Sequence, residues 1–290
     1  GHFGANFRGN VTQNAGSRLT IGGDLVFGGM AIDGLEGGTY NLHGGGLGVA
    51  GSVIETTGTV DAAQFQLNGG TVDIGGDILV QRFALAQSAA GNFAYTIPSN
   101  QSVRTTGTLS LGAGGTAELT LEQGGATLDT MNAYIGEGLA GMGTVHVRNG
   151  RTWNVEQFLR IGHKGTGVVN LVSGTINSEA LSGAKGIRMA ELSTGDATLI
   201  MGLPGGSGSA DPVINSKIAN FETSDEGRGR GLMHHGTVHQ LGANIIIGQV
   251  AGSEGTFTMM DGLVNVQPGS LRVGNTGTGL FEQVSGDVVV

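Results

Sequence analysis

Residues 159–174 read LRIGHKGTGVVNLVSG, and residues 271–286 read LRVGNTGTGLFEQVSG. Nine of the sixteen positions are identical, at a separation of 112 residues. Fainter copies of the phrase, each an apolar pair followed by Gly or another small residue, occur elsewhere, as in AYIGEGLAGMG at 133–143 and IIIGQVAGSEG at 245–255. One chain that repeats the same phrase in this way is built from a recurring structural unit.

The spacing of the copies gives the size of that unit. In each copy we mark the apolar residue that directly precedes the Gly or other small residue. The distances between successive marked residues are 26, 28, 58 and 26 residues, and the distance of 58 covers two periods. The mean period is about 27 residues, within the range of 20 to 50 that indicates stacked repeats. The marks are Ile135, Ile161, Met189, Ile247 and Val273.

Alternation of apolar and polar residues predicts that each unit contains short β-strands. Leu119 and Leu121 alternate with polar neighbours, as do Val145 and Val147, and a period of two places such residues on one face of a strand. Gly interrupts every stretch that could form a helix, at a cost of roughly 1 kcal/mol per interior Gly. Three short strands per period, joined by Gly-rich turns, predict an all-β, right-handed parallel β-helix (β-solenoid) of roughly ten coils.

The same pattern assigns individual side chains to the inside or the outside of the predicted coils. We expect the polar residues Glu118, His146, Arg148 and Asn170 to point outward. The residues predicted to point inward are Leu119, Leu121, Ile135, Val145, Val147, Trp153, Val155, Ile161, Val169, Leu171, Phe257, Met259 and Val273.

Composition agrees with a stack of coils. Gly accounts for 58 of 290 residues, which suits positions of positive φ at the corners. Charged residues make up only 13%, because like charges stacked about 4.8 Å apart repel by roughly 0.9 kcal/mol even in water. The net charge of −9 and the scattered basic residues argue against a nucleic-acid partner. No run of 18 apolar residues predicts a transmembrane helix, and the lack of Cys excludes disulfides.

The succession of xLxL, GG, TVxV and IGxxGxGT resembles the repeats of autotransporter-type passenger regions and related exported bacterial surface proteins. The resemblance covers most of the chain, best from about 108 to 286. It implies a right-handed parallel β-helix, an extracellular or bacterial cell-surface location, and a role as an adhesin, surface fibre or scaffold. It carries over no catalytic residue.

Two regions depart from the repeat, residues 82–104 and residues 203–236. We predict one β-solenoid over 1–290 with these two regions as lateral loop insertions, since extra residues in a solenoid emerge on one side. The second region holds His234 and His235, with His239 close behind, but no acidic or Cys partner stands at a ligand spacing. The sequence therefore predicts a solvated loop here rather than a metal site.

Paired carboxylates raise the question of a sugar-cleaving enzyme, because parallel β-helices also house polysaccharide lyases and glycosidases. The candidates are the pairs Asp73 with Asp77 and Glu118 with Glu122, and the single Glu137. None is accompanied by a His, an Arg and an aromatic platform for sugar rings, and Asp does not recur at every turn as a Ca²⁺ ladder requires. We predict no enzyme activity, no catalytic residue, no metal site and no cofactor.

The function predicted from these observations is structural. The chain is expected to be an extracellular subunit of a head-to-tail filament or a surface scaffold that associates with itself. An adhesin segment that binds a glycan or host surface through the lateral loops is the alternative, and a polysaccharide-cleaving enzyme comes third. The residues predicted to take part in self-association are Phe3, Phe7, Gln283, Val288 and Val290.

Overall fold

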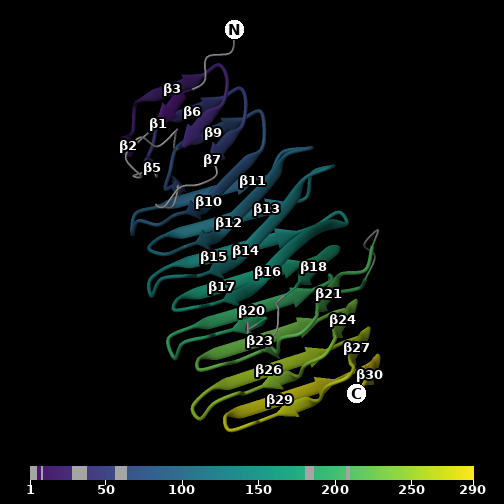
Figure 1. Cartoon of the computed structure of the whole chain (residues 1–290). Coiled ribbons are helices and arrows are strands. Elements are labelled where there is room, and N and C mark those ends of the chain that lie inside the picture. The colour runs from purple at the N-terminus through teal and green to yellow at the C-terminus, as the bar shows by residue number, and fades with distance from the viewer. Residues whose placement is uncertain (1–4, 8, 28–37, 56–63, 180–185, 207–209) are drawn as a thin grey trace.

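The computed structural model is an all-β parallel β-solenoid of about ten turns, and it describes residues 5–7, 9–27, 38–55, 64–179, 186–206 and 210–290. Figure 1 shows the coils stacked in sequence order from the N-terminus to the C-terminus. Each complete coil contributes one strand to each of three columns, and within a column each strand pairs in parallel with the equivalent strand one coil away. The fold class predicted from the repeat is confirmed.

The first column lies at the start of each coil. Its strands are β3 (Arg18–Ile21), β6 (Gly46–Val49), β9 (Thr71–Ile74), β11 (Asn92–Thr96), β13 (Thr116–Leu121), β15 (Met142–Val147), β17 (Thr166–Leu171), β20 (Asp196–Met201), β23 (Arg228–Met233), β26 (Glu254–Met259) and β29 (Thr278–Gln283). These strands form two sheets, one of three strands that ends with β9 and one of eight strands that begins with β11.

The second and third columns belong to one 19-stranded sheet. In the middle of the rod four long strands serve both columns and bend between them at a register shift: β10 (Ile78–Leu85), β12 (Ser102–Leu111), β14 (Thr127–Ile135) and β16 (Arg151–Ile161). The other strands of the second column are β1 (Ala5–Phe7), β4 (Leu25–Phe27), β7 (Val53–Glu55), β18 (Gly174–Ser178), β21 (Val213–Ser216), β24 (Thr237–Gln240), β27 (Leu263–Val266) and β30 (Asp287–Val289). Those of the third are β2 (Gly9–Gln13), β5 (Gly38–Leu42), β8 (Gln64–Leu67), β19 (Ile187–Met189), β22 (Phe221–Glu222), β25 (Ile245–Ile247) and β28 (Leu271–Val273).

The repeated phrase is the corner between the third column and the next coil. Gly162 and Gly274 follow directly after β16 and β28, and both have positive φ, +67° and +69°. A Cβ atom on Gly162 would lie only 2.4 Å from the main-chain oxygen of Asp196 in the next coil, so the corner needs Gly both for its φ and for the close approach. Because every coil turns at this corner, the sequence repeats it.

Alternation along the strands fills the interior with apolar side chains. Twelve of the thirteen residues predicted to point inward are buried, including Trp153, whose indole Nε1 donates a hydrogen bond to the Thr130 hydroxyl at 3.0 Å. The four residues predicted to point outward all have solvent-accessible surface. Val273 continues the inward register of the buried Ile247, as predicted, but its own side chain is 46% exposed. Val273 lies in β28, and among the described residues no further coil covers that strand.

The prediction of a lateral loop over residues 82–104 was wrong. The first residues of this region complete β10, Asn92–Thr96 form β11, and Ser102 begins β12. Phe93 and Tyr95 are almost fully buried and occupy the inward positions that aliphatic residues hold in later coils. Aromatic residues in place of aliphatic ones, between turn-forming Ala, Ser and Asn residues, obscured a regular coil.

The prediction for residues 203–236 also needs correction. The stretch between β20 and β21, residues 202–212, is longer than the two residues that join β17 to β18, and its residues 207–209 lie outside the described part. From Val213 onward, however, the region supplies β21, β22 and the whole of β23, which pair in register with the neighbouring coils. The excursion is confined to about a third of the predicted insertion, and coil stacking continues past it.

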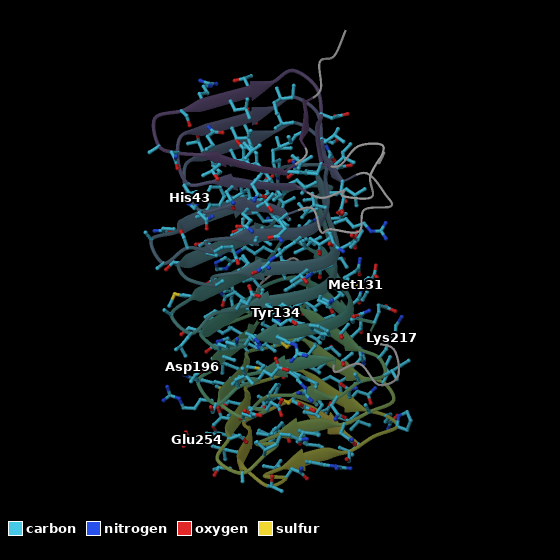
Figure 2. All side chains as sticks on the ribbon, turned by 60° about the vertical axis from the view of Figure 1, so that its left-hand side comes forward. His43, Met131, Tyr134, Asp196, Lys217 and Glu254 are labelled. Atoms are coloured by element: carbon cyan, nitrogen blue, oxygen red, sulfur yellow. The ribbon has the colours of Figure 1, made fainter. Side chains whose placement is uncertain are left out.

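The three columns meet at corners that run along the rod. Figure 2 places His43, Asp196 and Glu254 along the edge between the third and first columns, and Met131 and Lys217 along the edge between the second and third. No helix in the described part of the chain is long and apolar enough to cross a membrane.

Candidate functional site

The C-terminal end of the stack presents an apolar surface. Val273, Leu280, Val284 and Val290 are all between 46% and 62% exposed. They lie in or next to β28, β29 and β30, each of which pairs with a single strand of the coil before it. Phe281 stacks on the buried Phe257 with ring centroids 5.9 Å apart. We call this surface, formed by β28 to β30, the end face.

Three of the five predicted self-association residues lie at the end face. Gln283 continues a column of inward positions that Leu171, Met201, Met233 and Met259 occupy, and its side-chain amide donates to the Gly286 oxygen at 2.7 Å. Val288 packs partly against the core and Val290 is exposed.

The other two predicted residues belong to the opposite end of the chain. Phe7 lies in β1 at the first described coil, where it is the register partner of Phe27 in β4. Phe3 lies outside the described residues. The structure therefore places the four described residues of this set at the two ends of the stack and does not bring them together within one chain.

The histidines of the predicted loop do not converge. His235 lies in the turn between β23 and β24, where its Nδ1 is 3.2 Å from Oδ1 of Asp211 and its Nε2 accepts a hydrogen bond from the Leu203 main chain at 3.4 Å. His239 lies on β24, in register with Asn215 and Asn265. Within the described ranges no group of three or more His, Asp or Glu side chains is arranged to hold a metal ion.

The carboxylates considered for catalysis are held by contacts between coils. Glu118 lies 3.4 Å from Nε2 of His146, and Glu122 lies 3.5 Å from Nη1 of Arg148. Glu137 pairs with Arg82 of an earlier coil at 3.1 Å and also contacts the Ser110 hydroxyl. Asp77 accepts a hydrogen bond from the Ser102 main-chain N–H at 2.7 Å. Each of these carboxylates therefore serves to connect successive coils.

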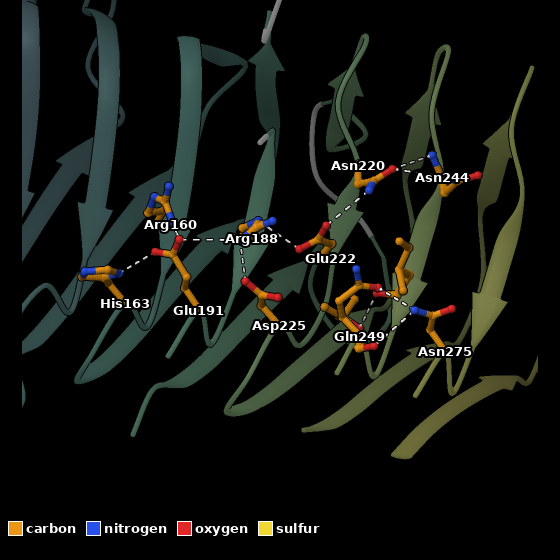
Figure 3. Close-up of polar contacts among 12 residues, drawn as sticks. Arg160, His163, Arg188, Glu191, Asn220, Glu222, Asp225, Asn244, Gln249 and Asn275 are labelled. Atoms are coloured by element: carbon orange, nitrogen blue, oxygen red, sulfur yellow. Dashed lines mark hydrogen bonds and ion pairs between the residues drawn. The ribbon is translucent and has the colours of Figure 1, made fainter. Parts of the chain in front are cut away.

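A cluster of charged residues that the sequence analysis missed lies at the corner after the third column, and Figure 3 shows it. We call Arg160, His163, Arg188, Glu191, Glu222 and Asp225 the charged corner. Three successive coils contribute to it, with strand residues at Arg160, Arg188 and Glu222 in register with one another.

Ion pairs connect the three coils of the charged corner. Arg188 is central, with its Nε 2.9 Å from Oε2 of Glu222 and its Nη1 2.5 Å from Oδ2 of Asp225. Glu191 pairs with Arg160 on one side and lies 3.7 Å from Nη1 of Arg188 on the other. Glu191 thus separates two guanidinium groups that the register places in adjacent coils, where they would otherwise repel.

Burial determines the electrostatics of the charged corner. Loss of solvent is the main cause that lowers the pKa of the Arg160 guanidinium, whose Cζ lies 4.4 Å from the ring centroid of Phe158. Burial, followed by the charges of Arg160 and Lys164, lowers the pKa of His163. The neutral imidazole then donates from Nδ1 to Oε2 of Glu191 at 2.5 Å. Buried charges of this kind are costly unless paired, so the charged corner selects one register of the coils.

The sequence carried a signal for the charged corner. Arg occupies the centre of LRI at 159–161 and of IRM at 187–189, which are equivalent third-column strands. A carboxylate stands three residues after the centre in two coils, as Glu191 and Asp225. Charges repeated at an outward strand position and at the following corner indicate pairing along the stack.

A partly buried histidine on the first column, His146 of β15, makes the stability of the stack dependent on pH. The His146 side chain is 14% exposed, and its Nδ1 lies 3.3 Å from Nη2 of Arg148 and 3.2 Å from Nδ2 of Asn170. Both neighbours are donors, so Nδ1 is the acceptor of a neutral ring. Burial first, and the Arg148 charge second, lower the pKa of His146.

We predict that His146→Asn makes the protein less sensitive to acid. Between its lowered folded pKa and the unfolded value near 6.5, the unfolded chain binds more protons, so stability falls as the pH drops from about 7 to 5. An Asn at 146 cannot titrate and can pair with Asn170 in the next coil. Urea unfolding at pH 7 and pH 5 should show a smaller acid loss in the variant than in the unmodified protein.

The exposed His43 supplies the matched control, because His43→Asn removes a histidine without disturbing a buried one. An acid loss that is the same in His146→Asn and in the unmodified protein would show that His146 does not titrate between these states.

Comparison with known proteins found no matching family model, no matching curated protein and no matching solved structure. The β-solenoid architecture therefore rests on the repeat in the sequence and on the strand pairing described above.

Proposed function

We propose that this chain is a structural protein, a rod that extends when the end face of one copy packs against the first coil of the next. The exposed apolar end face is the observation that carries this proposal. Covering it removes Leu280, Val284 and Val290 from water, which is favourable in proportion to the apolar area buried. The open edges of β29 and β30 would gain main-chain hydrogen bonds in the same step.

A contact between two different ends repeats without closing. Such a heterologous interface produces a filament, whereas a self-complementary one would produce a dimer.

The location that we propose is extracellular or at the bacterial cell surface. Its support is the resemblance of the repeats to autotransporter-type passenger regions. A scaffold or fibre at that location needs length and rigidity, and coils tied by in-register ladders and ion pairs provide both.

Self-association should depend on the open edge of β30. The Asp287 N–H donates back to the Gly262 oxygen at 2.8 Å, so by alternation the N–H of Val288 points away from β27 and toward a further coil. Val288→Pro removes that donor, and Val290→Lys adds a charge to the end face. We expect the unmodified protein to form assemblies that grow with concentration in sedimentation velocity, and the double variant to remain near 29.2 kDa.

Leu139→Lys is the matched control, because Leu139 is 70% exposed but lies in the middle of the stack. This variant should assemble as the unmodified protein does. The proposal fails if the unmodified protein stays monomeric at high concentration, or if the double variant assembles equally well.

A second candidate function is an adhesin segment that binds a glycan, and a pocket beside the excursion at 202–212 favours it. Asp211, His235 and Asp261 line this pocket together with Gly205 and Gly206, so that polar groups from three coils face one space. Binding to a glycan array that is lost in Asp211→Asn would support this candidate. Binding that is retained in the variant would place the glycan elsewhere.

A further inference from the structure

The first column of strands is interrupted between β9 and β11. The second and third columns continue through this level, where β10 pairs with β7 and β8, but β9 belongs to the three-stranded sheet and β11 to the eight-stranded sheet. The two strands lie next to each other in the coil order, as Figure 1 shows, and leave a groove of about 320 Å³ between them. Residues 70–74 line one side, and residues 93–96 with Pro98 line the other.

The turns that lead into the two strands differ in length. Three residues, 68–70, connect β8 to β9, whereas six residues, 86–91, connect β10 to β11. Asn68 in the shorter turn binds the longer turn: its side-chain oxygen accepts hydrogen bonds from the main-chain N–H groups of Gln87 at 2.5 Å and Ser88 at 3.0 Å.

Both strands present unpaired main-chain groups to the groove. The N–H groups of Thr71 and Gly75 donate to the preceding coil at 2.9 and 2.8 Å. Successive residues of a strand face opposite neighbours, so the main-chain groups of Val72 face β11. On β11, Ile97 donates to Thr120 at 2.9 Å, and by the same alternation Ala94 and Thr96 face β9. Among the described residues no main-chain hydrogen bond joins β9 to β11.

One end of the groove is already closed by a side chain. The Gln101 amide donates to the oxygens of Ile74 at 3.2 Å and Gly76 at 2.6 Å, and its own oxygen accepts from the Tyr95 hydroxyl at 2.5 Å. Gln101 therefore substitutes for a strand bond at that end and occupies the Ile74 oxygen. The main-chain groups left facing the groove are those of Val72 on β9 and of Ala94 and Thr96 on β11.

The groove has a single charge. Asp73 is the one ionisable carboxylate among the residues that line it, and no Lys or Arg lines it. A segment with a basic residue suits this lining better than an acidic one.

We propose that this groove binds an extended peptide segment that carries a basic residue, as an added strand between β9 and β11. Strand addition of this kind gains affinity from main-chain hydrogen bonds and specificity from alternate side chains. Two open edges on either side of one groove offer twice the main-chain pairing of an ordinary sheet edge. The site is separate from the end face and does not depend on filament formation.

The probe is a fluorescein-labelled peptide, GTVHVRN, which copies residues 143–149 and carries both a first-column strand pattern and an Arg. Fluorescence anisotropy should show saturable binding to the unmodified protein. Ala94→Pro removes a donor that faces the groove while leaving the bonds from β11 to β13 in place, and should weaken binding at least tenfold. Asp73→Asn should weaken binding a few-fold and reduce its dependence on salt.

Three controls make the outcome decisive. A probe with N-methyl groups at alternate residues keeps its N–H donors toward one edge only and should bind more weakly than the unmethylated probe. Circular dichroism checks that Ala94→Pro is folded, and Val72→Pro tests the opposite edge if it is not. The proposal is overturned if the unmodified protein shows no saturable binding up to about 1 mM peptide, a concentration that detects even weak binding. It is also overturned if the Pro variants bind as tightly as the unmodified protein, which would place the peptide at the open edge of β29.

Discussion

Replacing Trp153 with Ala is expected to lower the free energy of unfolding by about 3–5 kcal/mol, the range for removal of a fully buried aromatic side chain. Trp153 has no exposed surface and lies between Leu128 and Ile176 of the adjacent coils. The change leaves a cavity that the stacked coils cannot collapse, since each is held by ladders on both sides. It also removes the donor that satisfies the buried Thr130 hydroxyl.

Urea unfolding followed by far-UV circular dichroism measures this effect. Fluorescence does not serve, because Trp153 is the one tryptophan of the chain. Trp153→Phe is the matched variant: it keeps most of the volume and should cost clearly less than Trp153→Ala. A loss below about 1 kcal/mol for Trp153→Ala would mean that this side chain does not lie in the interior of the stack.

Replacing Arg188 with Met is expected to have a similarly large effect, about 3–5 kcal/mol, because it leaves buried carboxylates without their main cation. Glu222 is 2% exposed and Asp225 is 7% exposed, and Arg188 is the guanidinium that contacts both. The loss should appear as a lower urea midpoint for unfolding.

An exposed ion pair provides the control for that experiment. Arg104 lies 4.0 Å from Glu156, and both side chains are more than half exposed, so Arg104→Met should change stability by less than about 1 kcal/mol. Adding Glu222→Gln to Arg188→Met should recover part of the loss, since it removes one uncompensated charge. Equal effects of Arg188→Met and Arg104→Met would show that the charged corner contributes no more than a surface pair.

Periodicity was enough to predict the architecture of the chain. The alternation around Val145 and Val147 identified the inward face of β15, and the repeated IG and VG pairs identified the corner at Gly162 and Gly274. These features recur because every coil meets the same steric conditions. Handedness stays a prediction.

Features that occur only once were not predictable in the same way. The coil at 82–104 lacks the usual pattern because Phe93 and Tyr95 replace aliphatic residues. The predicted insertion at 203–236 is longer than the observed excursion at 202–212. The charged corner depends on contacts between residues 28 to 37 positions apart, from His163 with Glu191 to Arg188 with Asp225. The repeated Arg and carboxylate positions signal such contacts only when the coils are aligned with one another. The groove between β9 and β11 lies where the pairing of the first column is interrupted, and only the strand pairing in the structure reveals it.

The central claim, that this rod elongates by stacking end to end, is tested most directly by electron microscopy of the purified chain at high concentration. About ten coils at about 4.8 Å each make a rod close to 48 Å long. We expect fibres of uniform width with an axial repeat near that length, and their loss in the variant that combines Val288→Pro with Val290→Lys. Isolated rods of about that length in the unmodified protein would contradict the claim.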